Sequence, residues 1–429
     1  MDPIWGLLLL LVLFLAGMPV TYALGFSALF IMRFSTGMKW ITIGQQMMAG
    51  LNSFTILAVP LFLLAGKLMN KCGVTDRLFK FARAIVGWLP GGLGHVNVLA
   101  SFIFAGMSGT AIADASGLGL IEIKAMKDAG YDKDFSCAVT AASSTLGPII
   151  PPSMPLVVYG TISGTSIGAL FVAGVVPGII MGVVMMALVF VYAIIKKYPK
   201  DRLYTKRQLL HACKQGFLPC MTPVIILLGI YTGIFTPTES AAIVVIYAAI
   251  LGIFVYREIN FREFVEVLKE TVADAIGICI LISAATLFGN VLVKAMIPQT
   301  VMEFIVNSIS NKYVFLLILN LALLLVGMFM ETVSAITILT PIILPVAVAF
   351  GINPIHLGII MVLNLMIGVL SPPFGVVLFA INKVGEISFG RLVKALIPWF
   401  VVLLAALAIV TMVPWTCTWL PSTMGLGGL

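Results

Sequence analysis

The segments Gly147-Pro148-Ile149-Ile150-Pro151-Pro152 and Gly368-Val369-Leu370-Ser371-Pro372-Pro373 decide the fold of this chain. They close two copies of one motif, residues 105–152 and 326–373, which match at a constant offset of 221 without an insertion. Glycines and prolines that recur at equivalent places in two apolar halves are typical of secondary transporters, which bind their cargo between inverted repeats. The duplication therefore predicts a mechanism as well as a fold.

The composition indicates an all-α polytopic membrane protein. The 429 residues are 61% hydrophobic and only 10% charged, whereas soluble domains carry about 25% charged residues. Many apolar stretches are long enough to cross a hydrocarbon core of about 30 Å. The first stretch lacks a basic leader, so we expect it to be retained in the membrane rather than cleaved. The predicted spans lie near residues 4–31, 52–69, 168–195, 216–233, 239–256, 271–293 and 396–420, with interrupted spans near 135–163 and 355–382.

The net charge of +8 does not indicate a nucleic-acid partner, because the basic residues fall mostly in short segments between the spans. By the positive-inside tendency, such segments mark the cytoplasmic side of a membrane protein. Basic segments of this kind also contact the headgroups of the lipid bilayer. The basic segments are residues 67–83, 124–133, 196–214, 257–269 and 383–394.

Two further apolar stretches, residues 94–122 and 313–349, are interrupted by glycine and polar residues and are predicted to be re-entrant helical hairpins. The first hairpin lies between two cytoplasmic segments, so it enters and leaves from the cytoplasm. Five spans separate the two hairpins. Because five is odd, the second hairpin opens from the opposite face, and the two copies are related by inversion. The orientation of residues 1–50 stays open, since Gly17-Met18-Pro19 interrupts the first span.

The repeats also divide the chain into predicted parts. Each transport repeat consists of a hairpin followed by a broken helix, and the remaining helices form a scaffold. The predicted parts are scaffold helices at 1–93, transport repeat one at 94–165, scaffold helices with a cytoplasmic linker at 166–270, a span preceding the second hairpin at 271–312, transport repeat two at 313–382 and a C-terminal scaffold helix at 383–429.

The broken helices predict cation sites. Proline lacks an N–H and disfavours helix at the preceding residue, so each break leaves backbone carbonyls without partners. Inside a membrane such groups must be satisfied by protein, water or a ligand. Clustered neutral oxygens suit a small hard cation, and sodium is the expected occupant. The duplication predicts at least two sodium ions, one for each copy.

The hairpin tips supply polar side chains beside these breaks. Tip one contains Ser108 and Thr110, followed by Asp114, whereas tip two contains Glu331 and Thr332. Helix N-termini at such tips carry a partial positive charge that can face an anionic substrate. Each acid has two readings, a functional group in the membrane or a local helix cap. If both acids lie near the substrate, they disfavour a dicarboxylate and favour a sugar acid.

The chain resembles the large membrane subunit of TRAP (tripartite ATP-independent periplasmic) transporters over nearly its whole length. The matching motifs are residues 60–66 (Pro-Leu-Phe-Leu-Leu-Ala-Gly), 106–111, 146–153 and, most specific to the family, 233–242 (Gly-Ile-Phe-Thr-Pro-Thr-Glu-Ser-Ala-Ala). The resemblance implies a permease of the bacterial inner membrane that works by an elevator mechanism. It also implies sodium coupling, a small four-helix membrane subunit and a soluble periplasmic substrate-binding protein.

Carried onto matching positions, the resemblance implies two sets of site residues. The substrate set would be Ser108, Thr110, Asp114, Pro155 and Glu331. The cation set would be Ser108, Gly109, Thr145, Gly147, Pro148 and Pro151 in copy one, and Gly327, Glu331, Thr332, Gly368, Val369 and Pro372 in copy two. The first hairpin looks more like sialic-acid-type members, whereas Phe329 in place of Ser108 weakens the ligand set of copy two.

Other readings compete with sodium-coupled uptake of a sugar acid. The family also contains C4-dicarboxylate and keto-acid permeases. Gly106-Met107-Ser108-Gly109 matches the short motif of intramembrane serine proteases, but copy two has no serine at the equivalent position, and such an enzyme needs a base beside its serine. A passive channel would need neither sodium nor a binding protein. The chain has no phosphate-binding loop for ATP.

Overall fold

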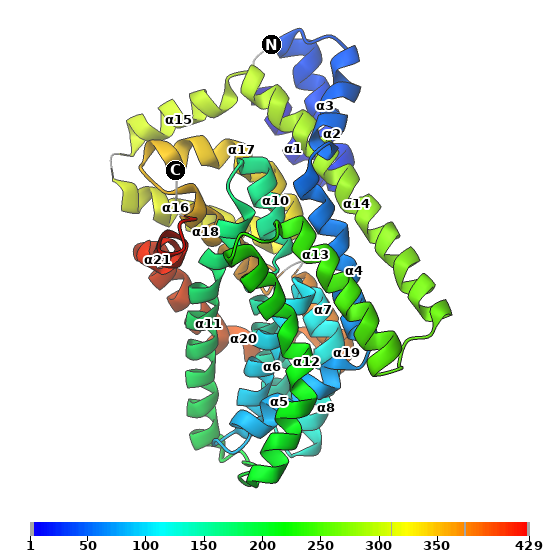
Figure 1. Cartoon of the computed structure of the whole chain (residues 1–429). Coiled ribbons are helices and arrows are strands. Elements are labelled where there is room, and N and C mark those ends of the chain that lie inside the picture. The colour runs from blue at the N-terminus through cyan, green and yellow to red at the C-terminus, as the bar shows by residue number, and fades with distance from the viewer. Residues whose placement is uncertain (1–3, 310, 373–374, 427–429) are drawn as a thin grey trace.

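The computed structural model describes residues 4–309, 311–372 and 375–426, and all regular structure in these ranges is helical. Eight of the described helices are long and apolar enough to cross a membrane. Figure 1 shows them packed as one elongated bundle. The helices are α1 (Ile4–Leu15), α2 (Val20–Ile31), α3 (Ile41–Leu51), α4 (Ala58–Lys71), α5 (Val74–Val86), α6 (Gly92–Ser108), α7 (Ala111–Ala113), α8 (Gly119–Asp128), α9 (Lys133–Ser143), α10 (Met154–Ser163), α11 (Ile167–Lys196), α12 (Lys206–Tyr231), α13 (Pro237–Ile250), α14 (Phe261–Lys294), α15 (Ile297–Ser308), α16 (Lys312–Phe329), α17 (Thr332–Ala349), α18 (Pro354–Gly368), α19 (Val376–Gly385), α20 (Phe389–Met412) and α21 (Trp415–Thr423).

Both predicted hairpins are present. In the first, α6 ends at Ser108 and the chain returns through α7, a π-helical turn η3 (Asp114–Leu118) and α8. In the second, α16 ends at Phe329 and α17 begins at Thr332. A left-handed glycine, Gly109 with φ of 62°, makes the first of these turns, a conformation that side chains with a Cβ rarely adopt.

Both predicted helix breaks are present as well. The first interrupted helix runs through α9 and the short 3-10 turn η4 (Ser144–Leu146) and resumes as α10. The second ends with α18 and resumes as α19. The prolines at 148, 151 and 152 explain the first break, because they remove backbone donors and push the preceding residues out of helical geometry. Pro373, the last residue of the second matching segment, lies outside the described residues.

The two repeats are inverted, as predicted. In Figure 1 the body of hairpin one, α6 and α8, lies below the centre of the molecule, and the body of hairpin two, α16 and α17, lies above it. Between the hairpins lie the broken α9–α10 pair, the four membrane-length helices α11, α12, α13 and α14, and the short helix α15. The second half of each broken helix packs against the opposite repeat, since α10 contacts α17 and α19 contacts α8. The two repeats are therefore interlocked around one centre.

The duplication extends further than the matching residues. A short helix precedes each hairpin, α5 in the first copy and α15 in the second, and the two lie at almost the same 221-residue offset. Helix α5 is amphipathic, with Leu78 and Ala82 buried and Lys80 exposed. No apolar run marks these helices, so sequence hydropathy did not predict them.

The structure corrects two boundaries. The interruption at residues 17–19 separates α1 from α2, so the first predicted span is two helices. The basic segments 67–83 and 257–269, which were expected between spans, are largely helical: Lys67 and Lys71 belong to α4, and α14 begins at Phe261. A helix continues through charged residues when those residues occupy one face and the other face packs. Hydropathy alone therefore ended the first of these helices too early, at residue 69, and began the second too late, at residue 271.

Candidate functional site

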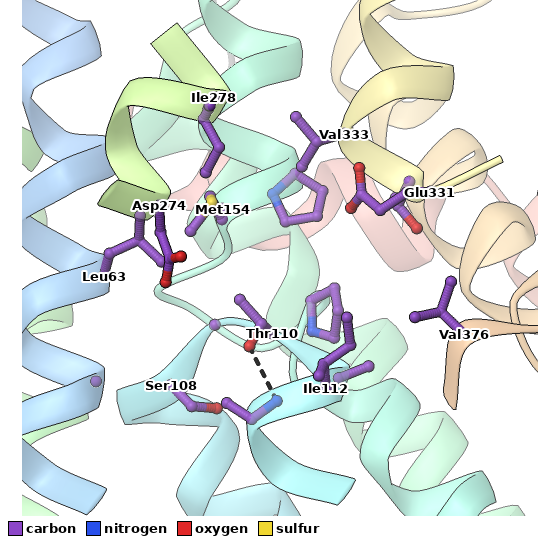
Figure 2. A pocket seen from close by; sticks show the side chains of 18 of the residues that line it. Leu63, Ser108, Thr110, Ile112, Met154, Asp274, Ile278, Glu331, Val333 and Val376 are labelled. Atoms are coloured by element: carbon purple, nitrogen blue, oxygen red, sulfur yellow. Dashed lines mark hydrogen bonds between the residues drawn. The ribbon is translucent and has the colours of Figure 1, made fainter. Parts of the chain in front are cut away.

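A cavity of about 750 Å³ lies between the two hairpin tips and the helices α2, α4 and α14. Its volume is within the range of about 300–1,000 Å³ that is usual for small-molecule sites. Figure 2 shows side chains from both repeats entering it, with Ser108 and Thr110 on one side and Val333 and Glu331 on the other. The two copies thus meet as predicted, and both hairpin tips line the cavity between them.

The first tip is held tightly against the first helix break. A Cβ atom on Gly109 would lie 2.5 Å from the Pro152 carbonyl oxygen, and one on Gly147 would lie 3.0 Å from the Thr110 carbonyl oxygen. Thr110 caps α7, because its Oγ1 accepts a hydrogen bond of 3.3 Å from the Ala113 N–H. Glycine at 109 and 147 therefore lets two irregular backbones approach each other beside the cavity.

The second tip uses a glycine pair for the same purpose. A Cβ atom on Gly368 would lie 2.6 Å from the Cα atom of Gly327, so α16 and α18 touch at backbone distance. Glu331 caps α17, since its carboxylate accepts a hydrogen bond of 3.1 Å from the Ser334 N–H. The local cap reading of Glu331 is confirmed, and the same side chain also lines the cavity.

The N-termini of three half-helices face the cavity. First-turn residues of α10, α17 and α19 all contribute to its lining, among them Pro155, Val333 and Val376. The unpaired N–H groups of a helix N-terminus carry a partial positive charge of about half a proton. The ends of α10 and α19 create a favourable environment for an anion, whereas at α17 the Glu331 carboxylate already accepts a hydrogen bond from the first turn.

Two hydroxyl groups at the tips have no hydrogen-bond partner within the described part of the chain. Ser108, at the end of α6, is 6% exposed, and Thr332, at the start of α17, is 1% exposed. Both residues line the cavity. Buried polar groups nearly always have a partner in native structures. One unpartnered hydroxyl at each tip, at the end of α6 in the first and at the start of α17 in the second, is what a bound ion or water would satisfy.

Three charged residues line the cavity within the described ranges. Asp274 of α14 and Glu331 supply carboxylates, which enter from different sides in Figure 2. Lys67 of α4 is the third, and its Nζ lies 2.6 Å from Asp274 Oδ2. Two of the three charges therefore lie on the wall formed by α4 and α14, and the other, Glu331, lies at the second tip.

The structure brings most of the predicted site residues together. Asp114 is an exception among the predicted substrate residues, because it is 1% exposed and lies outside the cavity lining, one turn behind the tip. A second group lies outside the lining, at the breaks or against them: Thr145, Gly147, Pro151, Gly327, Gly368 and Pro372. The residues in the lining are Ser108, Gly109, Thr110, Pro148, Pro155, Glu331, Thr332 and Val369.

Sequence reasoning missed the residues that α2, α4 and α14 contribute to the cavity. The most important are Lys67, Asn70 and Asp274. Asp274 carried a usable indication, since it is an acid within a predicted span, which is a functional hypothesis by default. Lys67 also lay within a predicted span, residues 52–69, but it was counted with the basic segment 67–83.

Comparison with known proteins identifies the family. Residues 7–416 match the model of the tripartite ATP-independent periplasmic transporter, DctM component. This chain belongs to that family. It is 44% identical to the sialic acid TRAP transporter large permease protein SiaM of Vibrio cholerae, over 94% of both chains. It is 39% identical to the C4-dicarboxylate TRAP transporter large permease protein DctM of Pseudomonas aeruginosa, over 87% of both chains.

Membership of the TRAP family settles several expectations. The chain is a transport permease of the inner membrane and not an enzyme, so the serine protease reading is wrong. The fold is shared with a more distant transporter, YdaH of Alcanivorax borkumensis, at a TM-score of 0.61 and 16% identity, over 90% of this chain and 89% of that one. The TRAP chain described here thus has the fold of a membrane transporter built around its central cavity.

Proposed function

We propose that this TRAP permease takes up an organic acid by sodium-coupled secondary transport, with sialic acid or a similar sugar acid as the substrate. One observation carries the proposal: both hairpin tips, each with an unpartnered buried hydroxyl, meet at one cavity that three helix N-termini face. Hydroxyl and carbonyl oxygens suit sodium, and helix N-termini suit a carboxylate. The cavity thus combines the features needed to bind cation and anion side by side.

Two sodium sites are proposed, one beside each tip. Ser108 and the backbone at Pro148 would hold the first ion, whereas Thr332 and the backbone at Val369 would hold the second. All four residues line the cavity. Sodium bound there would supply positive charge next to the substrate. Of the remaining predicted cation residues, those at the breaks would shape these sites from behind, whereas Gly109 and Glu331 line the cavity at the tips.

The charges of the cavity favour a monoanion. Two carboxylates, Asp274 and Glu331, face the cavity against one lysine, and a dianionic substrate would be repelled more strongly than a monoanion of the same size. A sialic-acid permease from Vibrio cholerae is among the relatives. C4-dicarboxylate or keto-acid transport is the alternative, and the Pseudomonas aeruginosa relative, a C4-dicarboxylate permease, supports the first of these two. In either case, the small four-helix subunit and the periplasmic binding protein are the proposed partners.

An elevator movement is the proposed mechanism. The two interlocked repeats would form the moving body, and α2, α4 and α14 would belong to the static scaffold. In support, the cavity lies between these two groups of elements and not within either of them. Sliding of the repeats against α4 and α14 would carry the site across the membrane while its tip glycines keep their contacts.

The proposal is tested by uptake of radiolabelled sialic acid into proteoliposomes that contain this chain and its small membrane subunit, with the binding protein outside. We expect accumulation under an inward sodium gradient and background uptake when potassium replaces sodium. Equal uptake with the two cations would show that sodium does not drive transport. Succinate and pyruvate, tested in the same way, decide between the sugar-acid proposal and its alternative.

The tip hydroxyls give a second prediction. Ser108→Ala and Thr332→Val should each raise the sodium concentration for half-maximal uptake, by about tenfold if one charge-assisted contact worth about 1.4 kcal/mol is lost. Matched controls are Ser116→Ala and Thr337→Val, because those hydroxyls already donate to the carbonyls of Ile112 and Val333. Sodium dependence that moves equally in the controls would exclude the two tip sites.

A further inference from the structure

Lys67 occupies a special position in the cavity wall. Among the described residues that line the cavity, it is the only lysine or arginine. Its side chain is 26% exposed. The preceding residue, Gly66, packs on hairpin one so closely that a Cβ atom there would lie 3.2 Å from the Met107 carbonyl oxygen and from the Ser108 Cα. The backbone of α4 at Lys67 therefore lies directly beside the first tip.

Lys67 pairs with two acids of the neighbouring helix α14. Its Nζ lies 2.6 Å from Asp274 and 3.8 Å from Glu270, and one turn further along α4, Lys71 lies 4.0 Å from Glu266. These partners recur at four-residue spacing on both helices, so they form one ladder along the two facing sides. The ladder ends at the cavity, because Lys67 and Asp274 line it and Lys71 and Glu266 do not.

A purely structural brace does not explain the end of this ladder. Ion pairs that remain partly exposed contribute only about 0–1 kcal/mol to stability, and α4 and α14 are in contact and each has buried apolar side chains. Charged residues within membrane spans are costly and usually serve the transported species. Lys67, which is held between two acids at the rim of the cavity, can therefore exchange one of these carboxylates for a carboxylate of the substrate.

The negative charge of an organic acid favours a positively charged side chain in the cavity wall. An organic acid that enters the cavity meets the carboxylates of Asp274 and Glu331, and Figure 2 shows the Asp274 carboxylate on the side where the first tip lies. Helix N-termini and sodium offset part of that repulsion. Lys67 carries the only full positive charge that the described lining supplies. An ammonium group has three donors, so it can bind a substrate carboxylate while it keeps one contact to α14.

We propose that Lys67 binds the carboxylate of the anionic substrate from the α4 side, and that Asp274 and Glu270 hold its ammonium group in place when the cavity contains no substrate. This inference rests on the proposed function, because it needs an anionic substrate. It adds a recognition residue on α4, which lies outside both hairpins and both broken helices. The substrate would then bridge the moving repeats and α4 at this stage of transport.

The test compares three variants by the initial rate of sodium-driven sialic acid uptake in proteoliposomes, or of succinate uptake if the wild type prefers it. Lys67→Met should raise KM at least about tenfold, which corresponds to about 1.4 kcal/mol. Lys71→Met is the matched control on the same helix face and should leave KM within about twofold, since Lys71 does not reach the cavity. Asp274→Asn should lower KM, because it releases the lysine and removes a carboxylate that repels the anion.

The KM values of these variants distinguish carboxylate binding by Lys67 from a purely structural ion pair. A brace between α4 and α14 would make Lys67→Met and Asp274→Asn equally harmful, because both break the 2.6 Å ion pair, and that result would overturn carboxylate binding. An unchanged KM in Lys67→Met would overturn it too. Lys67→Gln replaces the methionine variant if the latter elutes as an aggregate. A wild type that takes up no organic acid under a sodium gradient would instead refute the proposed function, and with it this inference.

Discussion

Replacement of Gly368 by alanine is expected to reduce uptake to background and to lower the thermal midpoint of the purified protein. The new methyl group would lie 2.6 Å from the Cα atom and 2.8 Å from the carbonyl carbon of Gly327, both of which are backbone atoms. Backbone cannot rotate aside as a flexible side chain does, so α16 and α18 must separate. Overpacking of this kind costs about 1–3 kcal/mol, and here it also displaces the second tip from the cavity.

The matched control for this variant is Gly390→Ala. Gly390 lies in α20 and has no atom within 4 Å of an added Cβ. Alanine has a higher helix propensity than glycine by about 1 kcal/mol, so the control should be as active as the wild type and no less stable. Uptake and thermal midpoint are measured in the same preparations. If Gly368→Ala behaved like Gly390→Ala, the glycine contact between α16 and α18 would not be needed for transport.

Replacement of Asn97 by leucine is expected to cause the largest loss of stability among single substitutions in hairpin one. The Asn97 Nδ2 group donates to Glu122 Oε2 at 2.6 Å and to Thr140 Oγ1 at 2.7 Å, and all three side chains are buried. These bonds join α6, α8 and α9 inside the first repeat. Leucine leaves the Glu122 carboxyl group without its donor, at a cost of about 3 kcal/mol.

The effect is read from the thermal midpoint in detergent, followed by intrinsic fluorescence. Asn290→Leu is the control, because Asn290 is exposed on α14 and, within the described residues, its side-chain amide donates a hydrogen bond to Gln46 alone. Adding Glu122→Leu to Asn97→Leu should recover part of the stability, since the acid that lost its donor is then removed. A midpoint for Asn97→Leu equal to that of Asn290→Leu would mean that the network does not stabilise the repeat.

The hairpins and breaks were predictable because their cause is local. Proline removes a donor wherever it stands, and glycine permits a left-handed turn at Gly109 in any context. Counting basic segments then oriented the repeats, and that inference needed no knowledge of packing. The same local reasoning failed at α5 and α15, which are too polar to register as membrane spans although they repeat at the same offset.

The composition of the cavity was only partly predictable. The tip residues Ser108, Thr110, Glu331 and Thr332 were expected near one another because inversion brings equivalent points together, and they line one cavity. Asp114 was expected beside them but lies outside the lining, since Ile112, Ala113 and Ser116 face the cavity from this segment and Asp114 is buried away from it. Packing decides which side of such a short segment faces the cavity, and nothing in the local sequence marks that side.

Local chemistry therefore specified the elements of this TRAP permease: where the chain breaks, which segments re-enter and how the two copies are oriented. Helix packing decided which residues of α4 and α14 form the cavity wall opposite the tips. Lys67 and Asp274 are about two hundred residues apart in sequence, yet they form a 2.6 Å ion pair at the rim of the cavity. Helix breaks depend on backbone groups of adjacent residues, whereas a shared cavity depends on which helix faces meet, and only the folded bundle determines those faces.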